Sequence, residues 1–496
     1  MEIFNAEFFV LTLALVGVVI IIAALLSGLI DSSDLPQVGA FLALGAMLGP
    51  AGLGLLDVTL HSPILRVVAT LSLVLVLFTD AVSVSIAEMR RHGALAFRVL
   101  GPGTLLSAAL TSMAAWKLLG LPFPAAAILG AALASTDPVM LRSLLRRPGL
   151  PESVRLALRL ESGLNDVVLL PIIFVAIPFL GREAFLTATQ WAHLGLDLFL
   201  LGPGAGIAVG LLGTSALEMI RRKTGVLRDY ESIYSLGIAF TAYAAAEAVH
   251  GSGFLAAFAA GLTIAALDVE LCDCFLEYGQ TTAEMALLFT FVLFGAHLIW
   301  SGFTVLSWPV ALFSLVALLI RPVAFLISLT GTRLDFRSRM LIAWFGPRGL
   351  SSLLLVLVPV FAVVPDAELL FFICCFFVLL SIAVHGGSLM LLKRDESRPT
   401  VPAAANVADN SATDLPPHSI STTGTNEHAD RMTINEMRTI QESGAPYLVL
   451  DVRADRSLAA SDLRAHGAVR VPADRAIERL KDLDVPRQTW LFAFCA

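Results

Sequence analysis

The sequence predicts an all-α polytopic membrane protein with about thirteen transmembrane helices, followed by a small α/β tail domain. Hydrophobic residues make up 57% of the 496 residues, charged residues make up only 15%, and the mean hydropathy is +0.82. Apolar runs of about 20 residues, the length that crosses a bilayer, recur from near residue 8 to about residue 392. This composition excludes a soluble globular protein, and a nucleic-acid partner is not expected.

The expected membrane domain covers residues 1–395. Its spans are centred near residues 19, 46, 72, 108, 133, 167, 204, 239, 260, 288, 316, 350 and 379. The first run is expected to be a retained span, because no basic segment precedes it and no small-residue cleavage site follows it.

Basic residues in the short loops predict the orientation of the chain. They follow odd-numbered spans: Arg90 and Arg91; Arg142, Arg146 and Arg147; Arg221, Arg222 and Lys223; Arg333, Arg337 and Arg339; Lys393 and Arg394. Loops rich in Lys and Arg lie in the cytoplasm. We therefore expect the N-terminus outside and the C-terminus in the cytoplasm of a cell inner membrane.

Residues 396–431 have the composition of a flexible linker, rich in small and polar residues with few large apolar ones. Residues 432–496 then predict a small α/β domain. "YLVLDVRADRS" indicates a strand and a turn, "AIERLKDL" a short helix, and "TWLFAFCA" a second strand. The sequence ends directly after this strand, so the domain is expected to be C-terminally incomplete.

The sixth apolar run, "LRLESGLNDVVLLPIIF", carries four polar side chains on one helix face: Glu161, Ser162, Asn165 and Asp166. Their positions i, i+1, i+4 and i+5 fall within an arc of roughly 140°. Ionisable groups inside a membrane are costly and usually functional. The alternative is a polar seam that packs against another helix.

The fifth run contains "STDP", in which a proline interrupts a helical segment. Proline disfavours helix at the residue before it, so Thr136 and Asp137 are expected where the helix is unwound. There the Thr136 hydroxyl and a freed carbonyl can act as oxygen ligands for a cation, and Asp137 can offset the positive end of a half helix. The alternative is a simple proline kink with Asp137 as a helix N-cap.

The twelfth run has a similar interruption, "GPRGL", which places Arg348 inside the membrane. Interrupted spans in the two halves of a chain predict inverted repeats, with two broken helices that cross near the midplane. Arginine is always charged and must face a carboxylate, and Glu161 is the first candidate.

These motifs together resemble the cation/proton antiporter family, in the branch of prokaryotic sodium/proton antiporters related to animal sodium/proton exchangers. The motifs that carry the likeness are "PQVGAFLALGAMLGPAGLGLL", "STDP", "ESGLND", "HGSGFLAAFAAGL", "GPRGL" and "SIAVHG". The resemblance implies that Asp166 binds cation and proton in turn and that Thr136 and Ser162 help to hold sodium, with Glu161 acting through water. It also implies that Arg348 pairs with the region of Glu161 and Asn165, and that the protein is a homodimer.

A charge count predicts one-for-one exchange. If Arg348 neutralises Glu161 and the half-helix ends offset Asp137, then Asp166 remains as a single charge, which one sodium ion or one proton can neutralise. The resemblance agrees, since asparagine at position 165 is typical of electroneutral members.

The expected function is therefore electroneutral sodium/proton antiport by alternating access, serving pH homeostasis. The sequence does not decide sodium against lithium or potassium. No cofactor is expected, and the protein is expected to be a secondary transporter and not an enzyme. The alternatives are a cation channel or uniporter, and a membrane-anchored sulfurtransferase or sulfur sensor.

The last alternative comes from the tail, which resembles a rhodanese domain in "YLVLDVRADRS", "RAHGAVRVPAD" and "LFAFC". The resemblance implies that Cys495 is the rhodanese-like cysteine. The loop that would follow this cysteine is missing from the sequence, so no sulfurtransferase activity is expected of this chain.

Overall fold

The computed structural model describes residues 37–145, 150–180, 187–223, 228–267, 273–396, 446–452, 467–471 and 489–494, with a few single positions besides. The chain forms two compact units, residues 1–401 and 402–496. Most of the span expected near residue 19 and nearly all of the expected linker lie outside the described residues.

The first unit is built from helices that follow one another along the chain. In order they are α2 (Gln37–Leu48), α3 (Pro63–Val82), α4 (Ile86–Arg91), α5 (Gly93–Arg98), the π-helix η1 (Val99–Gly103), α6 (Thr104–Leu119), α7 (Phe123–Ala134), α8 (Pro138–Leu145), α9 (Glu152–Leu180), α10 (Ala188–Leu196), the π-helix η2 (Asp197–Leu201), α11 (Gly202–Lys223), α12 (Arg228–Ala248), α13 (Gly253–Ala266), α14 (Asp273–Ala296), the 3₁₀-helix η3 (Leu298–Phe303), α15 (Trp308–Ser328), α16 (Phe336–Trp344), α17 (Leu350–Phe361) and α18 (Ala367–Glu396).

The helical membrane fold predicted from the sequence is confirmed. In the described part of the chain, 7 helical segments are long and apolar enough to cross a bilayer, and shorter apolar helices accompany them. The span centres expected from residue 46 to residue 379 all fall inside helices. The full count of about thirteen spans and the inverted repeats stay predictions.

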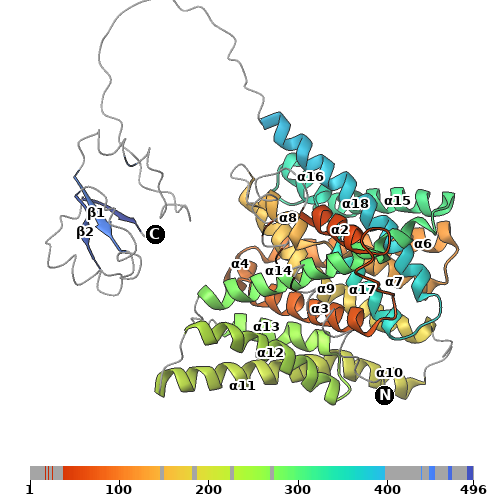
Figure 1. The fold of residues 1–496 in the computed structure, drawn as a ribbon, viewed down its shortest axis with the longest axis horizontal. Coiled ribbons are helices and arrows are strands. Elements are labelled where there is room, and N and C mark those ends of the chain that lie inside the picture. The colour runs from red at the N-terminus through yellow and green to blue at the C-terminus, as the bar shows by residue number, and fades with distance from the viewer. Residues whose placement is uncertain are drawn as a thin grey trace, which may run out of the picture. The chain divides into compact units, whose positions relative to one another are not determined.

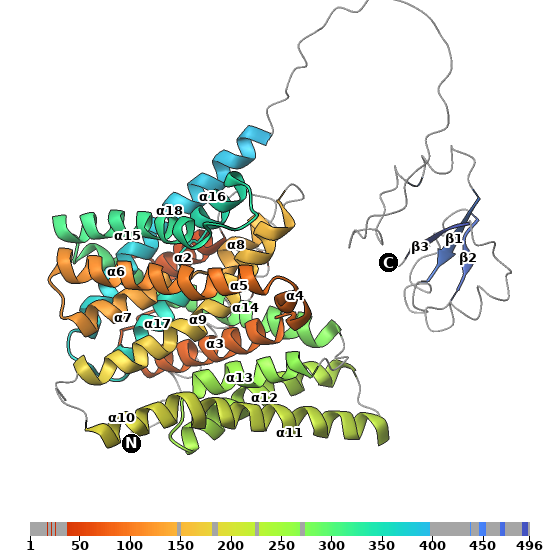
Figure 2. The same ribbon diagram turned by 180° about the vertical axis from the view of Figure 1, so that it is seen from behind.

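The helices of this unit lie side by side in layers (Figures 1 and 2). Helices α11, α12 and α13 form one edge, and α6 and α15 lie toward the opposite edge. Helix α13 packs on α3, α6 packs on both α7 and α15, and α7 packs on α9. The face of α9 that carries Glu161, Ser162, Asn165 and Asp166 is buried inside the bundle.

Several helix boundaries follow from local sequence. The Ser62 side chain caps α3 by accepting a hydrogen bond from the Leu65 backbone N–H, and Pro63 takes the first helical position. A Leu-Gly-Pro-Gly sequence occurs at both π-helices, at residues 100–103 and 201–204. Proline cannot donate its backbone hydrogen bond inside a helix, and the wider π turn accommodates that loss.

The second unit contains a parallel sheet with the strand order β2-β1-β3, formed by β1 (Tyr447–Asp451), β2 (Val469–Arg470) and β3 (Trp490–Phe494). Both strands expected from the sequence are present. The helix expected at residues 476–483 and Cys495 lie outside the described residues. The rhodanese likeness stays a prediction.

Helices α2 and α14 approach each other through glycines, as is common where membrane helices pack closely. A Cβ atom built on Gly45 would lie 2.2 Å from the Val292 carbonyl oxygen, whereas one on Gly39 of the same helix would meet nothing within 4 Å.

Gly45→Ala is therefore expected to lower the free energy of unfolding by about 1–3 kcal/mol, because the two backbones must move apart. Thermal unfolding of the purified protein in detergent measures the effect. Gly39→Ala is the matched control, with no loss expected. Equal melting temperatures for the two variants would show that this crossing is not tightly packed.

Candidate functional site

Two helices break where they meet, as the sequence predicts. Residues 135–137 are not helical between α7 and α8, and residues 345–349 are not helical between α16 and α17. The Asp137 backbone N–H donates to the Pro347 carbonyl oxygen at 3.0 Å, so the two breaks are in direct contact. Within the membrane, non-helical backbone is tolerated only where it is buried in protein or lines a water-filled cavity.

The Asp137 carboxylate connects both breaks. Its Oδ1 accepts from the Val139 N–H at 2.9 Å, at the start of α8, and its Oδ2 accepts from the Leu350 N–H at 2.8 Å, at the start of α17. Asp137 is thus a helix cap, as one interpretation expected, and it also lies at the positive ends of two half helices, as the other expected.

Arg348 lies at the carbonyl end of a half helix, whereas Asp137 lies at amide ends. Its Nη1 donates to the carbonyl oxygens of Ala134 at 2.7 Å and Ser135 at 2.9 Å, where α7 terminates. Its backbone N–H donates to Ser381 Oγ at 2.8 Å, which ties the second break to α18. A guanidinium group is favourable there because the carbonyl end of a helix is partially negative.

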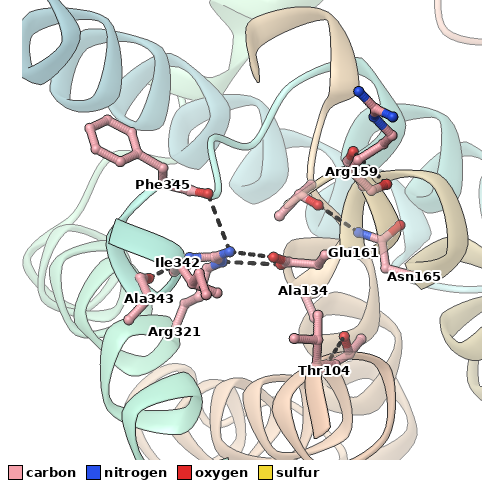
Figure 3. A network of polar contacts seen from close by, with 12 residues as sticks. Thr104, Ala134, Arg159, Glu161, Asn165, Arg321, Ile342, Ala343 and Phe345 are labelled. Atoms are coloured by element: carbon pink, nitrogen blue, oxygen red, sulfur yellow. Dashed lines mark hydrogen bonds and ion pairs between the residues drawn. The ribbon is translucent and has the colours of Figure 1, made fainter. Parts of the chain in front are cut away.

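The expected pair between Arg348 and Glu161 is wrong. Glu161 pairs with Arg321 instead, with Nη2 to Oε2 at 2.6 Å and Nε to Oε1 at 3.3 Å (Figure 3). The Arg321 guanidinium also donates to the carbonyl oxygens at the end of α16, namely those of Ile342, Ala343 and Phe345. Each broken helix therefore ends against an arginine, and Glu161 completes the set of acceptors around the second one.

The Asp166 carboxylate faces the first break from α9. Its Oδ1 accepts a hydrogen bond from Ser135 Oγ at 2.5 Å, and Asp166 is only 5% exposed. The adjacent Asn165 donates from Nδ2 to Thr136 Oγ1 at 2.8 Å. The Asn165 Oδ1 is buried and accepts no hydrogen bond from the described residues.

The structure therefore brings Asp166, Asn165 and Thr136 together. Ser162 lies on the same helix but donates to the Arg159 carbonyl oxygen at 3.4 Å and makes no recorded hydrogen bond to Asp166 in the described part of the chain. Ser135 was missed as a site residue, although its place beside Thr136 in the unwound stretch was the signal that could have identified it.

Charges at the crossing do not balance. Three buried carboxylates, Asp137, Glu161 and Asp166, face two buried guanidinium groups, Arg321 and Arg348. Glu161 is neutralised by direct contact with Arg321, and Asp137 is stabilised by two helix N-termini. Among these five groups one negative charge remains, and Asp166 lacks an ion pair among the described residues.

A multi-span helical bundle with two touching helix breaks and a buried, unbalanced carboxylate is the arrangement of a secondary transporter. Residues 12–393 match the family described as sodium/hydrogen exchanger, transmembrane, and the chain belongs to that family.

Two similar proteins are named as K(+)/H(+) antiporters. The K(+)/H(+) antiporter NhaP of Alkalimonas amylolytica is 26% identical over 388 residues, which cover 77% of this chain and 66% of that protein. The K(+)/H(+) antiporter NhaP2 of Shewanella sp. (strain MR-4) is 28% identical over 382 residues, which cover 75% of this chain and 65% of that protein. The matched part of the chain thus spans about two thirds of the length of these relatives.

A solved structure has the same fold. The sodium proton antiporter MjNhaP1 from Methanocaldococcus jannaschii at pH 8 aligns with a TM-score of 0.63 over 78% of this chain and 100% of that chain, at 21% identity. This likeness shows the fold of the membrane unit.

Replacing Glu161 with Gln leaves the buried Arg321 charge without its carboxylate. We expect the free energy of unfolding to fall by about 3–5 kcal/mol. Glu368→Gln is the control, because Glu368 pairs with His61 at an exposed position, and it should cost less than about 1 kcal/mol. Thermal unfolding compares the two, and a Glu161→Gln variant as stable as the control would contradict the assignment.

Proposed function

We propose that this chain exchanges one monovalent cation for one proton at Asp166 by alternating access. The observation that carries the proposal is the unbalanced Asp166 carboxylate, buried beside two helix breaks. An isolated charge inside a membrane protein is costly, so the carboxylate favours a bound cation or a bound proton over the empty state.

Coupling follows from competition for that carboxylate. A cation and a proton both neutralise the single excess negative charge, and each excludes the other. The empty, charged site crosses between the two access states reluctantly because its charge stays uncompensated in a low-dielectric interior. One cation therefore moves in one direction for each proton that moves in the other, and no net charge crosses the membrane.

The proposed cation ligands are Asp166, Thr136 and Ser162, with Asn165 in support and Glu161 acting indirectly. Ser135 joins this set because its hydroxyl already contacts Asp166. The Asn165 Oδ1 accepts no hydrogen bond from the described residues, and it is a further hard oxygen ligand of the kind that binds such cations. The carbonyl oxygens of Ala134 and Ser135 accept hydrogen bonds from Arg348. They are therefore less available as cation ligands than the sequence prediction of a freed carbonyl implied.

Glu161 has a mainly structural part in this proposal. Both of its oxygens contact the Arg321 guanidinium, so the carboxylate has little capacity left for a cation. It can influence the ion at Asp166 through water or through its charge.

Sodium is the cation proposed from the sequence, and potassium is supported by the names of the NhaP and NhaP2 relatives. Exchange assays with sodium, potassium and lithium decide between them. The cation and the proton are cargo, and no resident cofactor is part of the proposal.

The wider setting is proposed with the same function: a homodimer in the inner membrane, with the C-terminus in the cytoplasm and a role in pH homeostasis. The family match supports an exchanger over a channel or a membrane-anchored sulfur enzyme. The rhodanese likeness of the tail stays a prediction.

Asp166→Asn is expected to abolish cation-driven proton movement, because the amide cannot exchange a proton for a cation. Vesicles that contain the purified protein and a pH-sensitive dye measure this as the pH change after sodium or potassium is added. Wild-type exchange should persist without a membrane current. Cation-driven exchange by the folded Asp166→Asn variant would refute the proposal.

Gly349→Ala tests the contact between the two breaks. A Cβ on Gly349 would lie 2.0 Å from Asp137 Oδ2, whereas a Cβ on Gly163 would meet only Asp80 Cβ at 3.8 Å. We expect Gly349→Ala to lower the exchange rate about a hundredfold, because it displaces the residues that position Asp166. Gly163→Ala is the matched control. Equal rates in the same vesicle assay would show that the contact does not set the site geometry.

A further inference from the structure

The polar contacts of the membrane unit divide its helices into two groups. The site bundle comprises α5 to α9 and α15 to α18, at residues 93–180 and 308–396. Within it, buried hydrogen bonds connect Arg348 to α7 and Arg321 to both α9 and α16, and Arg98 Nη1 donates to the Ser328 carbonyl oxygen at 3.1 Å. The helices that hold Asp166 are thus connected to one another.

The flanking group comprises α2, α3 and α11 to α14, at residues 37–82 and 202–296. It has polar contacts of its own. Ser72 Oγ of α3 lies 2.9 Å from Thr290 Oγ1 of α14, and the Tyr234 hydroxyl of α12 donates to the Gly213 carbonyl oxygen of α11 at 2.9 Å. Where the two groups meet, α3 packs on α9 and α17, and their apolar side chains share one hydrophobic core.

Two ion pairs among the described side chains connect the groups, at opposite ends of α3. His61 precedes α3 and pairs with Glu368 of α18 at 2.7 Å, with both side chains more than half exposed. Arg142 of α8 pairs with Glu284 of α14, with side chains that are 37% and 22% exposed. The second pair is the better shielded from water, so its electrostatic contribution is screened less.

Arg142 lies close to the site along the chain and in space. Helix α8 starts directly after the break at Asp137, and Arg142 interacts electrostatically with both Asp137 and Asp80. Asp80 also interacts with Asp166, and its Cβ lies against α9 at Gly163. Arg142 thus pairs with Glu284 of α14 and interacts with Asp80 of α3, which in turn interacts with Asp166 of α9. These three carboxylates are called the acidic path below.

A fixed positive charge on an acidic path opposes the passage of another cation. Under the proposed alternating access, the connected site bundle must also shift against the flanking group, because Asp166 has to face each side in turn. A polar contact across that boundary that forms in one arrangement and breaks in the other stabilises the first. Its strength therefore biases the equilibrium between the two arrangements.

We propose that the Arg142–Glu284 ion pair is a gate latch. It holds α8 against α14 and places the guanidinium across the acidic path to Asp166 from the end of α3 that carries Asp80, which is the predicted cytoplasmic side. Release from Glu284 frees α8 and opens this path. The inference rests on the proposed antiport for its role but not for its structural test.

Hydrogen exchange of the purified full chain provides that structural test. We expect the amides of residues 138–145 to exchange about three to ten times faster in Glu284→Gln and in Arg142→Gln than in the wild type. The charge-swapped double variant, Arg142→Glu with Glu284→Arg, should restore slow exchange. Glu368→Gln, which removes the exposed pair at the opposite end of α3, is the matched control and should leave these amides unchanged.

Vesicle assays on the same variants test the role in transport. Loss of the latch should lower the half-saturating cation concentration at the cytoplasmic face and raise it at the other face, by about threefold in each case, because the population shifts toward cytoplasmic access. A merely structural defect would weaken both faces alike. The charge swap should return both values toward those of the wild type.

Each outcome decides the matter. Unchanged exchange at residues 138–145 in both single variants, or failure of the charge swap to restore it, overturns the latch. If Arg142→Gln does not fold, then Arg142→Lys, which keeps the charge, should show an intermediate rate, and a rate equal to that of Glu284→Gln overturns it. Faster amide exchange in a chain that transports no cation supports the latch and refutes the antiport proposal.

Discussion

The contact between two helix breaks is the constraint on which the rest of the membrane unit depends. Asp137 caps the N-termini of both α8 and α17, and Arg348 binds the carbonyl end of α7. Each helix thus supplies the charge that the broken end of the other requires. Because unpaired backbone groups are costly at this depth, the two breaks stabilise each other and would be unfavourable apart.

Because the two breaks cap each other, no positive group among the described residues forms an ion pair with Asp166. The positive groups nearby are already engaged, Arg348 with carbonyl oxygens and Arg321 with Glu161. The Asp166 carboxylate has only the Ser135 hydroxyl as a recorded partner among the described residues. A carboxylate held in place by the protein but not neutralised by it can bind a cation or a proton from outside.

Much of this arrangement could be predicted from the sequence, because proline and glycine interruptions identify the breaks and polar periodicity identifies the functional face of α9. The partners of the two arginines could not. Both are always charged, and the spacing along the chain does not tell which one reaches Glu161. Arg348 binds the end of α7 only because the breaks touch, and Ser135 acquires its role only through a contact between α9 and the unwound stretch. Such contacts depend on distances between helices that are remote in sequence.

The central claim is that a cation and a proton compete for Asp166. Proton release from the purified, weakly buffered protein tests it most directly, when sodium or potassium chloride is added at a pH where the site is protonated. Binding of a cation at such a site should displace about one proton per chain. The account predicts this release in the wild type and its loss in Asp166→Asn, whereas cation binding without proton release, or equal release from the variant, would contradict it.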